Sequence, residues 1–292
     1  MKDVAVILNP RAGHGADEDL QREIVELFAT HGREATIMAA GAKLGIRARA
    51  AVEAGCRVLV AAGGDGTVNA VASAVVGRET PLGVLPVGTL NHFAKDLGLP
   101  LELPDAVRIV AQGAVRQVDV GEVNGRYFLN NSSIGVYPRI VEMRHRYENS
   151  GLSKWIAALW ASLAVLRRRP FVDVRIHVGD DAVVRRTPFV FVGNNEYRMR
   201  GLGGVSRASL TGGQLAIYVM KASERLSLLR LGLEVMTRGV DQTPELDLLR
   251  VTESKVETRR RRLQVALDGE VRVLASPLEY RSRPGALRVL AP

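Results

Sequence analysis

The first part of the chain alternates between short apolar runs and longer amphipathic segments. The runs predict β-strands and the segments between them predict helices, in the order Val4–Leu8, Ala16–Thr30, Glu34–Met38, Ile46–Ala54, Val58–Ala62, Val68–Val76 and Leu82–Pro86. In the first helix, Leu20, Ile24, Leu27 and Phe28 recur on one face. This alternation predicts an α/β fold class with a doubly wound, mostly parallel sheet, whose ligands bind at the carboxyl ends of the strands.

The pattern changes after Asp119. Strand-like segments separated by Gly, Asn and charged turns follow, at Arg126–Asn130, Val172–Val178, Thr187–Val192, Gln214–Val219, Lys255–Leu267 and Glu270–Leu274. Two helical segments, Leu152–Leu166 and Arg225–Arg238, interrupt them. We expect an α/β domain over residues 1–121, which residues 281–292 could complete, and a β-rich antiparallel sandwich over residues 122–280.

The loop after Val58–Ala62 carries the most informative chemistry. Gly63, Gly64 and Gly66 allow close backbone approach around one carboxylate, Asp65, and Thr67 can cap the following helix. A strand, a glycine turn and a helix start form a phosphate-binding site. The alternative is an ordinary tight turn, but a purely structural turn has no need of a charge at its centre.

Two further loops follow strands of the same predicted sheet. They are Asn9–Gly15, NPRAGHG, and Pro86–Asn91, PVGTLN. Each offers glycine, an amide or hydroxyl side chain and backbone N–H groups near a helix start, so the three loops together predict a nucleotide site. Neither the P-loop pattern nor the GxGxxG pattern is present, which argues against a P-loop protein and a dinucleotide oxidoreductase.

Composition bounds the protein class. The apolar fraction is 47% and the charged fraction 24%, both ordinary globular values. No apolar run reaches the roughly 20 residues of a membrane span, and the start of the chain does not resemble a secretory signal. The single cysteine, Cys56, is expected to be a buried thiol, excludes an internal disulfide and fits a reducing cytoplasm. The histidine spacing argues against zinc.

Charge is distributed unevenly. Residues 1–121 hold 12 Lys and Arg against 14 Asp and Glu, a net charge of −2, whereas residues 122–292 hold 28 against 17, a net charge of +11. A basic second half suggests a polyanionic partner, either an acidic membrane or nucleic acid. Aromatic residues make up only 5% of the chain and do not interleave the basic clusters, which argues against nucleic acid.

An ordered set of motifs supports a family resemblance. GGDGTVN at Gly63–Asn69, together with NPRAGHG, PVGTLNHFAKDLGLP, VDVGEVNGRYFLN and LDGE at Leu267–Glu270, resembles the diacylglycerol kinase catalytic family. That family includes bacterial lipid kinases, sphingosine kinases and ceramide kinases, and is related distantly to NAD kinases and phosphofructokinases. The resemblance implies a nucleotide domain followed by a β-rich domain.

The resemblance also implies site residues. By analogy, ATP would bind at Asn9, Gly13, Gly63, Gly64, Asp65, Gly66, Thr67, Asn69, Gly88, Thr89 and Asn91. Mg²⁺ would accompany the phosphates, with Asp65, Asp119 and Asp268 as candidate ligands, since phosphoryl transfer depends on positioning and electrostatics. Glu270 matches the family's proton acceptor from the lipid hydroxyl, and Asp65 is the second candidate catalytic residue. Asp268-Gly269 is equally a hairpin turn signal, and a hairpin can carry the base.

Two departures from the family pattern affect these assignments. Many members have NDFA where this chain has Asn91, His92, Phe93 and Ala94, so an imidazole replaces a carboxylate of the metal-water network. The stretch Leu210–Tyr218, LTGGQLAIY, corresponds to an Asp-rich stretch, DDGLLD, with Thr211, Gly212 and Ala216 at the acidic positions. We expect the extra structural magnesium site of some members to be absent or weak.

The lipid side has two candidate segments. Leu152–Leu166 contains Trp155 and Trp160 and precedes Arg167–Arg169, a combination suited to an interfacial helix on anionic lipid, although its apolar character equally fits a core helix. Arg259–Arg262 is read as a solvated strand edge that could also attract an acidic membrane surface.

The leading hypothesis is therefore an ATP-dependent lipid kinase that phosphorylates a hydroxyl of diacylglycerol or a related lipid. We expect it in the cytoplasm, peripheral to the inner face of an anionic membrane, with no nucleic-acid partner, and the sequence leaves a homodimer open. The alternatives are phosphorylation of a soluble acceptor, as in NAD kinases, and a nucleotide- or lipid-binding regulatory module without catalysis. His92 and the Leu210–Tyr218 stretch keep the last alternative open.

Overall fold

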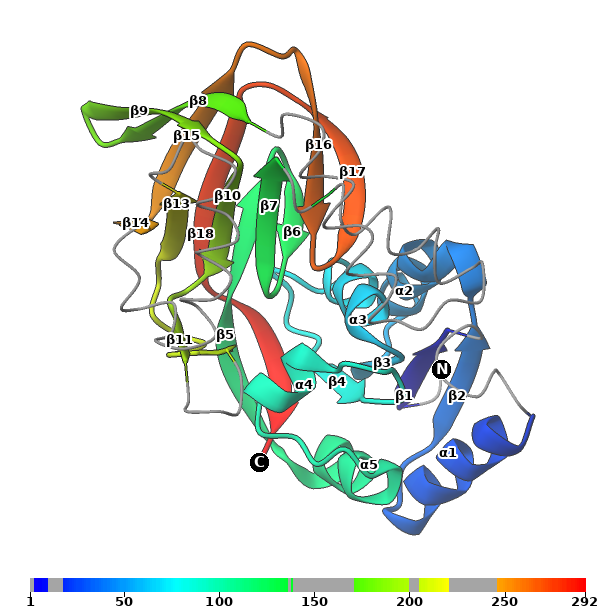
Figure 1. The fold of residues 1–292 in the computed structure, drawn as a ribbon. Helices are drawn as coiled ribbons and strands as arrows, with labels where there is room; N and C mark the ends of the chain where they lie inside the picture. Colours follow the sequence, from blue (N-terminus) through cyan, green and yellow to red (C-terminus); the bar gives the residue numbers. More distant parts are fainter. Residues whose placement is uncertain (1–2, 10–17, 136–137, 139–170, 200–204, 221–245) are drawn as a thin grey trace, which may run out of the picture. The chain divides into compact units, whose positions relative to one another are not determined.

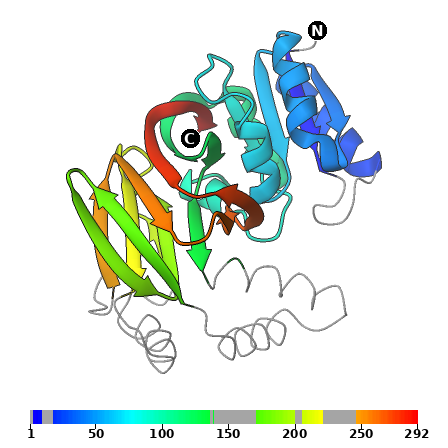
Figure 2. The same ribbon diagram turned by 90° about the horizontal axis from the view of Figure 1, so that it is seen from above.

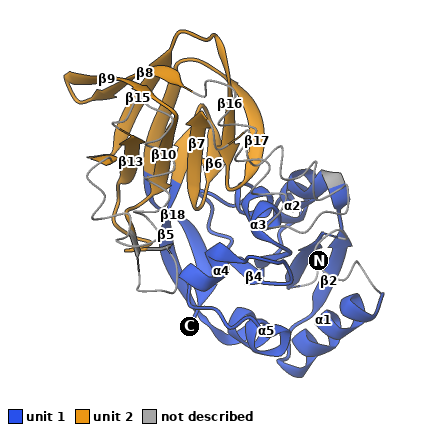
Figure 3. Cartoon of the chain, viewed as in Figure 1, with its two compact units in different colours: residues 1–120, 283–292 blue, residues 121–282 orange. Residues whose placement is uncertain are grey.

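The chain folds into two compact units. The computed structural model describes residues 3–9, 18–135, 138, 171–199, 205–220 and 246–292 (Figure 1). Unit 1 comprises residues 1–120 and 283–292, and unit 2 comprises residues 121–282 (Figure 3). The helices expected at 152–166 and 225–238, like Gly13, lie outside the described residues. Among the described residues, no helix combines the length and apolar character needed to cross a bilayer.

Unit 1 is an α/β layer structure. Its elements are β1 (Val4–Leu8), α1 (Glu18–Thr30), β2 (Ala35–Ala39), η1 (Gly41–Lys43), α2 (Leu44–Glu53), β3 (Val58–Ala62), α3 (Asp65–Ala72), β4 (Leu82–Leu85), α4 (His92–Asp96), α5 (Leu103–Gln112), most of β5 (Ala114–Val123) and the end of β18 (Leu278–Ala291). The strands lie in the order β2-β1-β3-β4-β18, and these pairs are parallel. Val289 of β18 pairs with Leu82, which brings the C-terminal strand beside β4 (Figure 2).

Helices cover both faces of this sheet. Figure 1 shows α1 and α5 on one side and α2 and α3 on the other. Every residue of β1 and β3 is buried, as the continuous apolar runs predict for central strands of a parallel sheet. Ile24 and Phe28 of α1 join Val107 and Val110 of α5 in the core against the strands. The predicted doubly wound, mostly parallel sheet is confirmed.

Unit 2 is built from two antiparallel sheets. One contains the start of β18, β15 (Glu253–Thr258), β8 (Val172–Val178) and β9 (Asp181–Thr187). The other has the order β14 (Leu246–Val251), β13 (Leu215–Met220), β10 (Phe189–Asn194), β7 (Asn131–Gly135), β16 (Arg262–Leu267) and β17 (Glu270–Ala275). The short strands are β6 (Arg126–Phe128), β11 (Tyr197–Met199) and β12 (Val205–Arg207). Alternate residues of both sheets form one apolar core, so the predicted sandwich is confirmed.

The predicted strand over Lys255–Leu267 is wrong in one respect. It is two strands, β15 and β16, which belong to different sheets. The Thr258 hydroxyl breaks the run, because it accepts a hydrogen bond from Arg260 N at 3.2 Å and donates one to Arg260 O at 3.1 Å. The Arg261 carbonyl then accepts a hydrogen bond from Ser276 N at 3.0 Å. The alternation of apolar residues continues across this turn, so the pattern hides it.

Two local expectations have different outcomes. Thr67 is not a helix cap, since α3 begins at Asp65, its N-cap position is Gly64, and no side chain caps it. Cys56 is a buried free thiol, as expected, and its burial raises its pKa.

Candidate active site

The candidate phosphate site lies in unit 1, where β1, β3 and β4 end. Backbone hydrogen bonds from Asn9 N to Ala62 O at 3.1 Å and from Gly63 N to Leu85 O at 3.2 Å hold the three strand ends side by side. Parallel strands thus place the starts of the three predicted loops at one sheet edge. The rest of the first loop, including Gly13, lies outside the described residues.

Thr67 links the first loop to the second. Its hydroxyl accepts a hydrogen bond from Asn9 Nδ2 at 3.0 Å, and its side chain is buried. A Cβ on Gly63 would lie 2.5 Å from the Thr67 Oγ1 atom, so only glycine fits beside this threonine. Thr67 therefore orients the Asn9 amide.

Asp65 links the second loop to the third. Its Oδ1 accepts a hydrogen bond from Phe93 N at 3.0 Å and its Oδ2 accepts one from His92 N at 3.2 Å. The carboxylate thereby compensates N–H groups at the start of α4, which have no partner within that helix. The His92 side chain itself is exposed.

The two loops also meet through glycines. A Cβ on Gly88 would overlap the Gly64 Cα atom, so the loop backbones touch. Asn91 adopts a left-handed conformation with φ 51° and donates through Nδ2 to Pro86 O and Gly88 O, each at 2.8 Å. Among the described residues its buried Oδ1 finds no donor. Of the remaining predicted nucleotide-binding residues, Thr89 is exposed, and Gly66 and Asn69 are half-buried.

The carboxylates of the three predicted metal ligands each accept hydrogen bonds from backbone amides. Besides Asp65, the buried Asp119 accepts a hydrogen bond from Gly285 N at 2.9 Å through Oδ1, and Asp268 is engaged within unit 2. In the part of the chain that the structure describes, no three His, Cys, Asp or Glu side chains converge in a way that could hold a metal ion. The donor set present thus does not by itself fit a magnesium site, and metal binding by these residues stays a prediction.

The DGE motif forms a hairpin in unit 2. Asp268 and Gly269 have φ values of 46° and 85° and connect β16 to β17 in a two-residue turn. Positive φ at both positions is the hairpin geometry that Asp-Gly sequences favour. The Asp268 carboxylate accepts three hydrogen bonds from consecutive backbone amides, Leu129 N at 2.7 Å, Asn130 N at 2.8 Å and Asn131 N at 3.0 Å.

Glu270 follows this turn as the first residue of β17. Its side chain is 51% exposed and its Oε2 accepts a hydrogen bond from Arg272 at 2.7 Å. Glu270 and Arg272 lie two residues apart, so they share one face of the strand. The sequence reasoning did not anticipate Arg272 as the partner of Glu270, although the spacing of two is a readable signal.

The backbone segment Leu129–Asn131, whose amides bind Asp268, also accepts hydrogen bonds through its carbonyl oxygens. Leu129 O accepts hydrogen bonds from Asn194 Nδ2 at 2.9 Å and from Arg207 Nη1 at 2.5 Å. Asn130 O accepts one from the Tyr197 hydroxyl at 3.1 Å. These side chains, which the sequence reasoning missed, fix the backbone on which the Glu270 hairpin rests.

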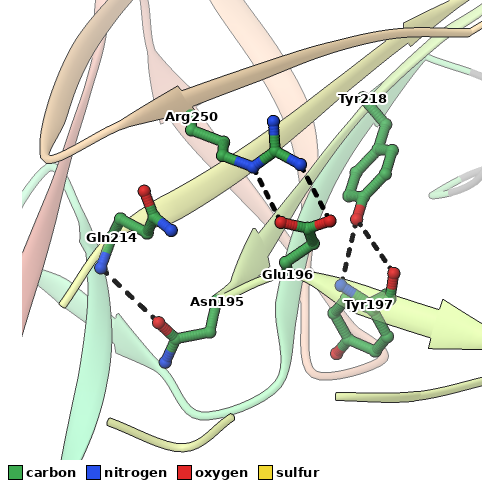
Figure 4. Close-up of polar contacts among 6 residues, drawn as sticks. All are labelled: Asn195, Glu196, Tyr197, Gln214, Tyr218 and Arg250. Atoms are coloured by element: carbon green, nitrogen blue, oxygen red, sulfur yellow. Dashed lines mark hydrogen bonds and ion pairs between the residues drawn. The ribbon is translucent and has the colours of Figure 1, made fainter. Parts of the chain in front are cut away.

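A second polar cluster surrounds the start of β11 (Figure 4). The Glu196 carboxylate forms a bidentate ion pair with Arg250 at 2.7 and 2.9 Å. The Tyr218 hydroxyl accepts a hydrogen bond from Tyr197 N at 3.0 Å and donates one to Tyr197 O at 3.4 Å. Asn195 Oδ1 accepts a hydrogen bond from Gln214 N at 3.5 Å, so side chains anchor the stretch where the family pattern has acids.

Comparisons with known proteins agree with this fold. A family model for the diacylglycerol kinase catalytic domain matches residues 3–123, and a model for the YegS C-terminal NAD kinase beta sandwich-like domain matches residues 134–291. A diacylglycerol kinase of Mycobacterium tuberculosis is 28% identical over 299 residues, covering 99% of this chain and 95% of that one. A diacylglycerol kinase of Bacillus subtilis is 36% identical over 151 residues, covering 50% of this chain and 48% of that one.

A crystal structure of a diacylglycerol kinase from Bacillus anthracis has the same fold. It superposes with a TM-score of 0.72 at 20% identity and covers 100% of this chain and 97% of that one. The fold, the loops and these relatives define an enzyme of the kinase type. The chain belongs to the diacylglycerol kinase catalytic family, with the YegS-like sandwich as its second half.

Proposed function

We propose that the protein transfers the γ-phosphoryl group of ATP to a hydroxyl of diacylglycerol or a related lipid. The proposal rests on the GGDGT loop, which lies in the part of the chain that matches the diacylglycerol kinase catalytic domain. Asp65 of this loop accepts hydrogen bonds from the amides of His92 and Phe93, which follow the second glycine loop. Family membership supports a lipid kinase, and the loop geometry supports phosphate binding.

The nucleotide phosphates would bind against the loops of unit 1. Gly64 and Gly88 present backbone without side chains, which permits the close approach that phosphate oxygens need. The exposed Thr89 hydroxyl is the side-chain group of the third loop that a nucleotide could contact, whereas the Asn91 side-chain oxygen is buried and Asn91 acts by holding the loop backbone. Asp65 would hold the two loops in register.

Magnesium would supply charge neutralisation of the transferred phosphate group when it accompanies the nucleotide. Asp65 is the carboxylate nearest in sequence to the glycines of the phosphate loop, but both its oxygens already accept amide hydrogen bonds. Metal binding by Asp65 therefore stays a prediction, because each carboxylate oxygen that accepts one hydrogen bond keeps a second lone pair.

Glu270 would act as the proton acceptor. In the reaction, the lipid hydroxyl oxygen forms a bond to the γ-phosphorus while the bond from that phosphorus to the β–γ bridging oxygen breaks, releasing ADP. The hydroxyl proton passes to the Glu270 carboxylate. Arg272 places a positive charge beside the Glu270 carboxylate, and the hydrogen bonds of Asp268 hold the turn that precedes Glu270.

The test is a kinase assay with mass-spectrometric detection of phosphorylated lipid. The purified protein is incubated with ATP, Mg²⁺ and a panel of diacylglycerols, ceramide and sphingosine, with NAD as a soluble acceptor. Glu270→Gln should lower kcat by at least about 100-fold, the usual scale of general-base catalysis, and leave the KM for ATP unchanged. Glu253→Gln, at another exposed glutamate of unit 2, is the matched control.

Equal turnover by the wild type and Glu270→Gln would show that Glu270 is not the proton acceptor. Phosphorylation of NAD without any lipid product would replace the lipid-kinase proposal with a soluble acceptor. ATP binding without transfer to any acceptor would leave a regulatory module.

A further inference from the structure

A turn in unit 2 carries four consecutive arginines. Arg259, Arg260 and Arg261 connect β15 to β16, and Arg262 is the first residue of β16. All four side chains are exposed. We call residues 259–262 the arginine turn.

The backbone of the arginine turn is held in place. Thr258 caps it through its hydroxyl, and Ser276 N binds the Arg261 carbonyl at 3.0 Å. Thr258 N in turn donates to Ser276 Oγ at 3.3 Å, so both ends are tied to the same residue. The four guanidinium groups therefore project from a fixed backbone, and less conformational freedom is lost when they bind a partner.

The positive charge of the turn is poorly compensated. Among the described residues, the acid that approaches it is Asp173, whose Oδ2 lies 3.9 Å from Arg259 Nε, and Arg259 remains 89% exposed. Arg186 of β9 is the cross-strand partner of Asp173, so a fifth arginine lies on the same face of the sheet as this aspartate. Other arginines of unit 2 have close acids, as in Arg250–Glu196 and Arg272–Glu270, each at 2.7 Å.

The chemistry of this surface suits phosphate groups. Arginine binds phosphate oxygens through a planar fork of donors, and clustered exposed arginines raise the local concentration of anions. Proteins that bind single-stranded nucleic acid add exposed aromatic platforms. Phe171, two residues before Asp173 in the sequence, has the Arg186 guanidinium 5.8 Å from the centroid of its ring.

We propose that the arginine turn, with Arg186, is a docking surface for the anionic phospholipid headgroups of a membrane. This inference rests on the proposed function, because a kinase that phosphorylates a bilayer lipid has to reach the bilayer surface. Each arginine near such a surface contributes about fivefold in affinity, and the contribution decreases as salt screens the charges.

The experiment measures binding to vesicles and needs no turnover. The full chain is sedimented with vesicles of phosphatidylcholine alone or with phosphatidylglycerol added, at low and high salt. The variant R259Q/R260Q/R261Q should bind the phosphatidylglycerol vesicles roughly 100-fold more weakly, by about fivefold per arginine. Binding of the wild type should weaken as salt increases.

The matched control is R175Q/K255Q/R281Q, which removes three exposed cations of the same unit that lie beside acids in the sheet. It should keep most of the vesicle affinity. Equal losses in both triple variants would overturn the proposal, because net charge alone would then explain binding. Unchanged vesicle binding together with lost binding to a fluorescent single-stranded DNA would assign the turn to nucleic acid and overturn it too.

Two further measurements keep the result interpretable. Thermal unfolding shows whether the triple variant folds, and the single variant Arg260→Gln, with an expected fivefold loss, replaces it if it does not. Turnover of a water-soluble short-chain diacylglycerol should be unchanged by the substitutions. Vesicle binding that depends on the turn in a protein without kinase activity would separate docking from the proposed function.

Discussion

Gly88 lies directly against Gly64, so that a Cβ on Gly88 would overlap the Gly64 Cα atom. The reverse relationship is different, because a Cβ on Gly64 would lie 3.7 Å from the Gly88 Cα, an ordinary van der Waals contact. Gly88→Ala should therefore separate the two loops and cost about 1–3 kcal/mol of unfolding free energy, with a raised KM for ATP. Chemical denaturation and steady-state kinetics measure the two effects.

Gly64→Ala is the built-in control for this substitution. It adds the same methyl group at the same contact without forcing the backbones apart, so it should cost only about 0.5–1 kcal/mol, the difference between glycine and alanine at the N-cap of α3. Equal destabilisation by both alanines would show that the loops are not packed as described.

Substitution of Asp65 distinguishes a structural from a metal-binding carboxylate. Asp65→Ala leaves the His92 and Phe93 amides without their acceptor and should lower unfolding free energy by about 1–3 kcal/mol and kcat/KM by more than tenfold. Asp65→Asn retains one acceptor oxygen and should be milder. Recovery of Asp65→Asn activity at higher Mg²⁺ concentration would instead favour the metal-ligand role.

Asp268 should be more important for stability than an exposed turn residue. Its carboxylate accepts three backbone amides at 2.7–3.0 Å, so Asp268→Ala should cost at least about 3 kcal/mol. Asp268→Asn tolerates positive φ and keeps one acceptor, and should cost less. Hydrogen exchange of the Leu129–Asn131 amides should speed up in both variants. Unchanged exchange protection of these amides would contradict their hydrogen bonding to Asp268.

Tyr280 should lower the folding stability of unit 2 at alkaline pH. It is buried, shares a 3.0 Å hydrogen bond with Ser132, and desolvation raises its pKa well above the usual range. Because the folded pKa exceeds the unfolded one, the contribution to stability is complete below about pH 10 and declines as the pH rises beyond it.

Unfolding free energy measured from pH 8 to pH 11 should therefore decline less in Tyr280→Phe than in the wild type. Tyr280→Phe should itself cost about 1 kcal/mol, because the buried Ser132 hydroxyl loses its hydrogen bond to the Tyr280 hydroxyl. Parallel pH profiles of the two proteins would show that Tyr280 ionises normally.

The regular elements of unit 1 were largely predictable from sequence. Val4–Leu8 and Val58–Ala62 are strands with the predicted bounds, because a continuous apolar run between glycines or charges has few other uses in an α/β fold. The prediction omitted α5 (Leu103–Gln112), whose apolar positions have helical spacing and whose Pro104 suits the first turn. The sequence therefore carries a readable signal for this helix.

The polar contacts of the site were not predictable in the same way. That Asp65 binds the His92 and Phe93 amides depends on the packing of two loops 27 residues apart, and no local pattern encodes it. The grip on Leu129–Asn131 depends equally on tertiary structure. The strand break at Thr258 was missed because strand propensity tolerates threonine and arginine, whereas the hydroxyl-capped turn depends on where two sheets diverge.

The burial of Cys56 has a practical consequence. It is the sequence's single cysteine, and burial both shields the thiol and raises its pKa, which suppresses the reactive thiolate. A cysteine introduced at an exposed position such as Arg260 would therefore react selectively in the native protein. Fluorophores and spin labels could be attached there without first removing the native thiol, and membrane approach could be read directly from the label.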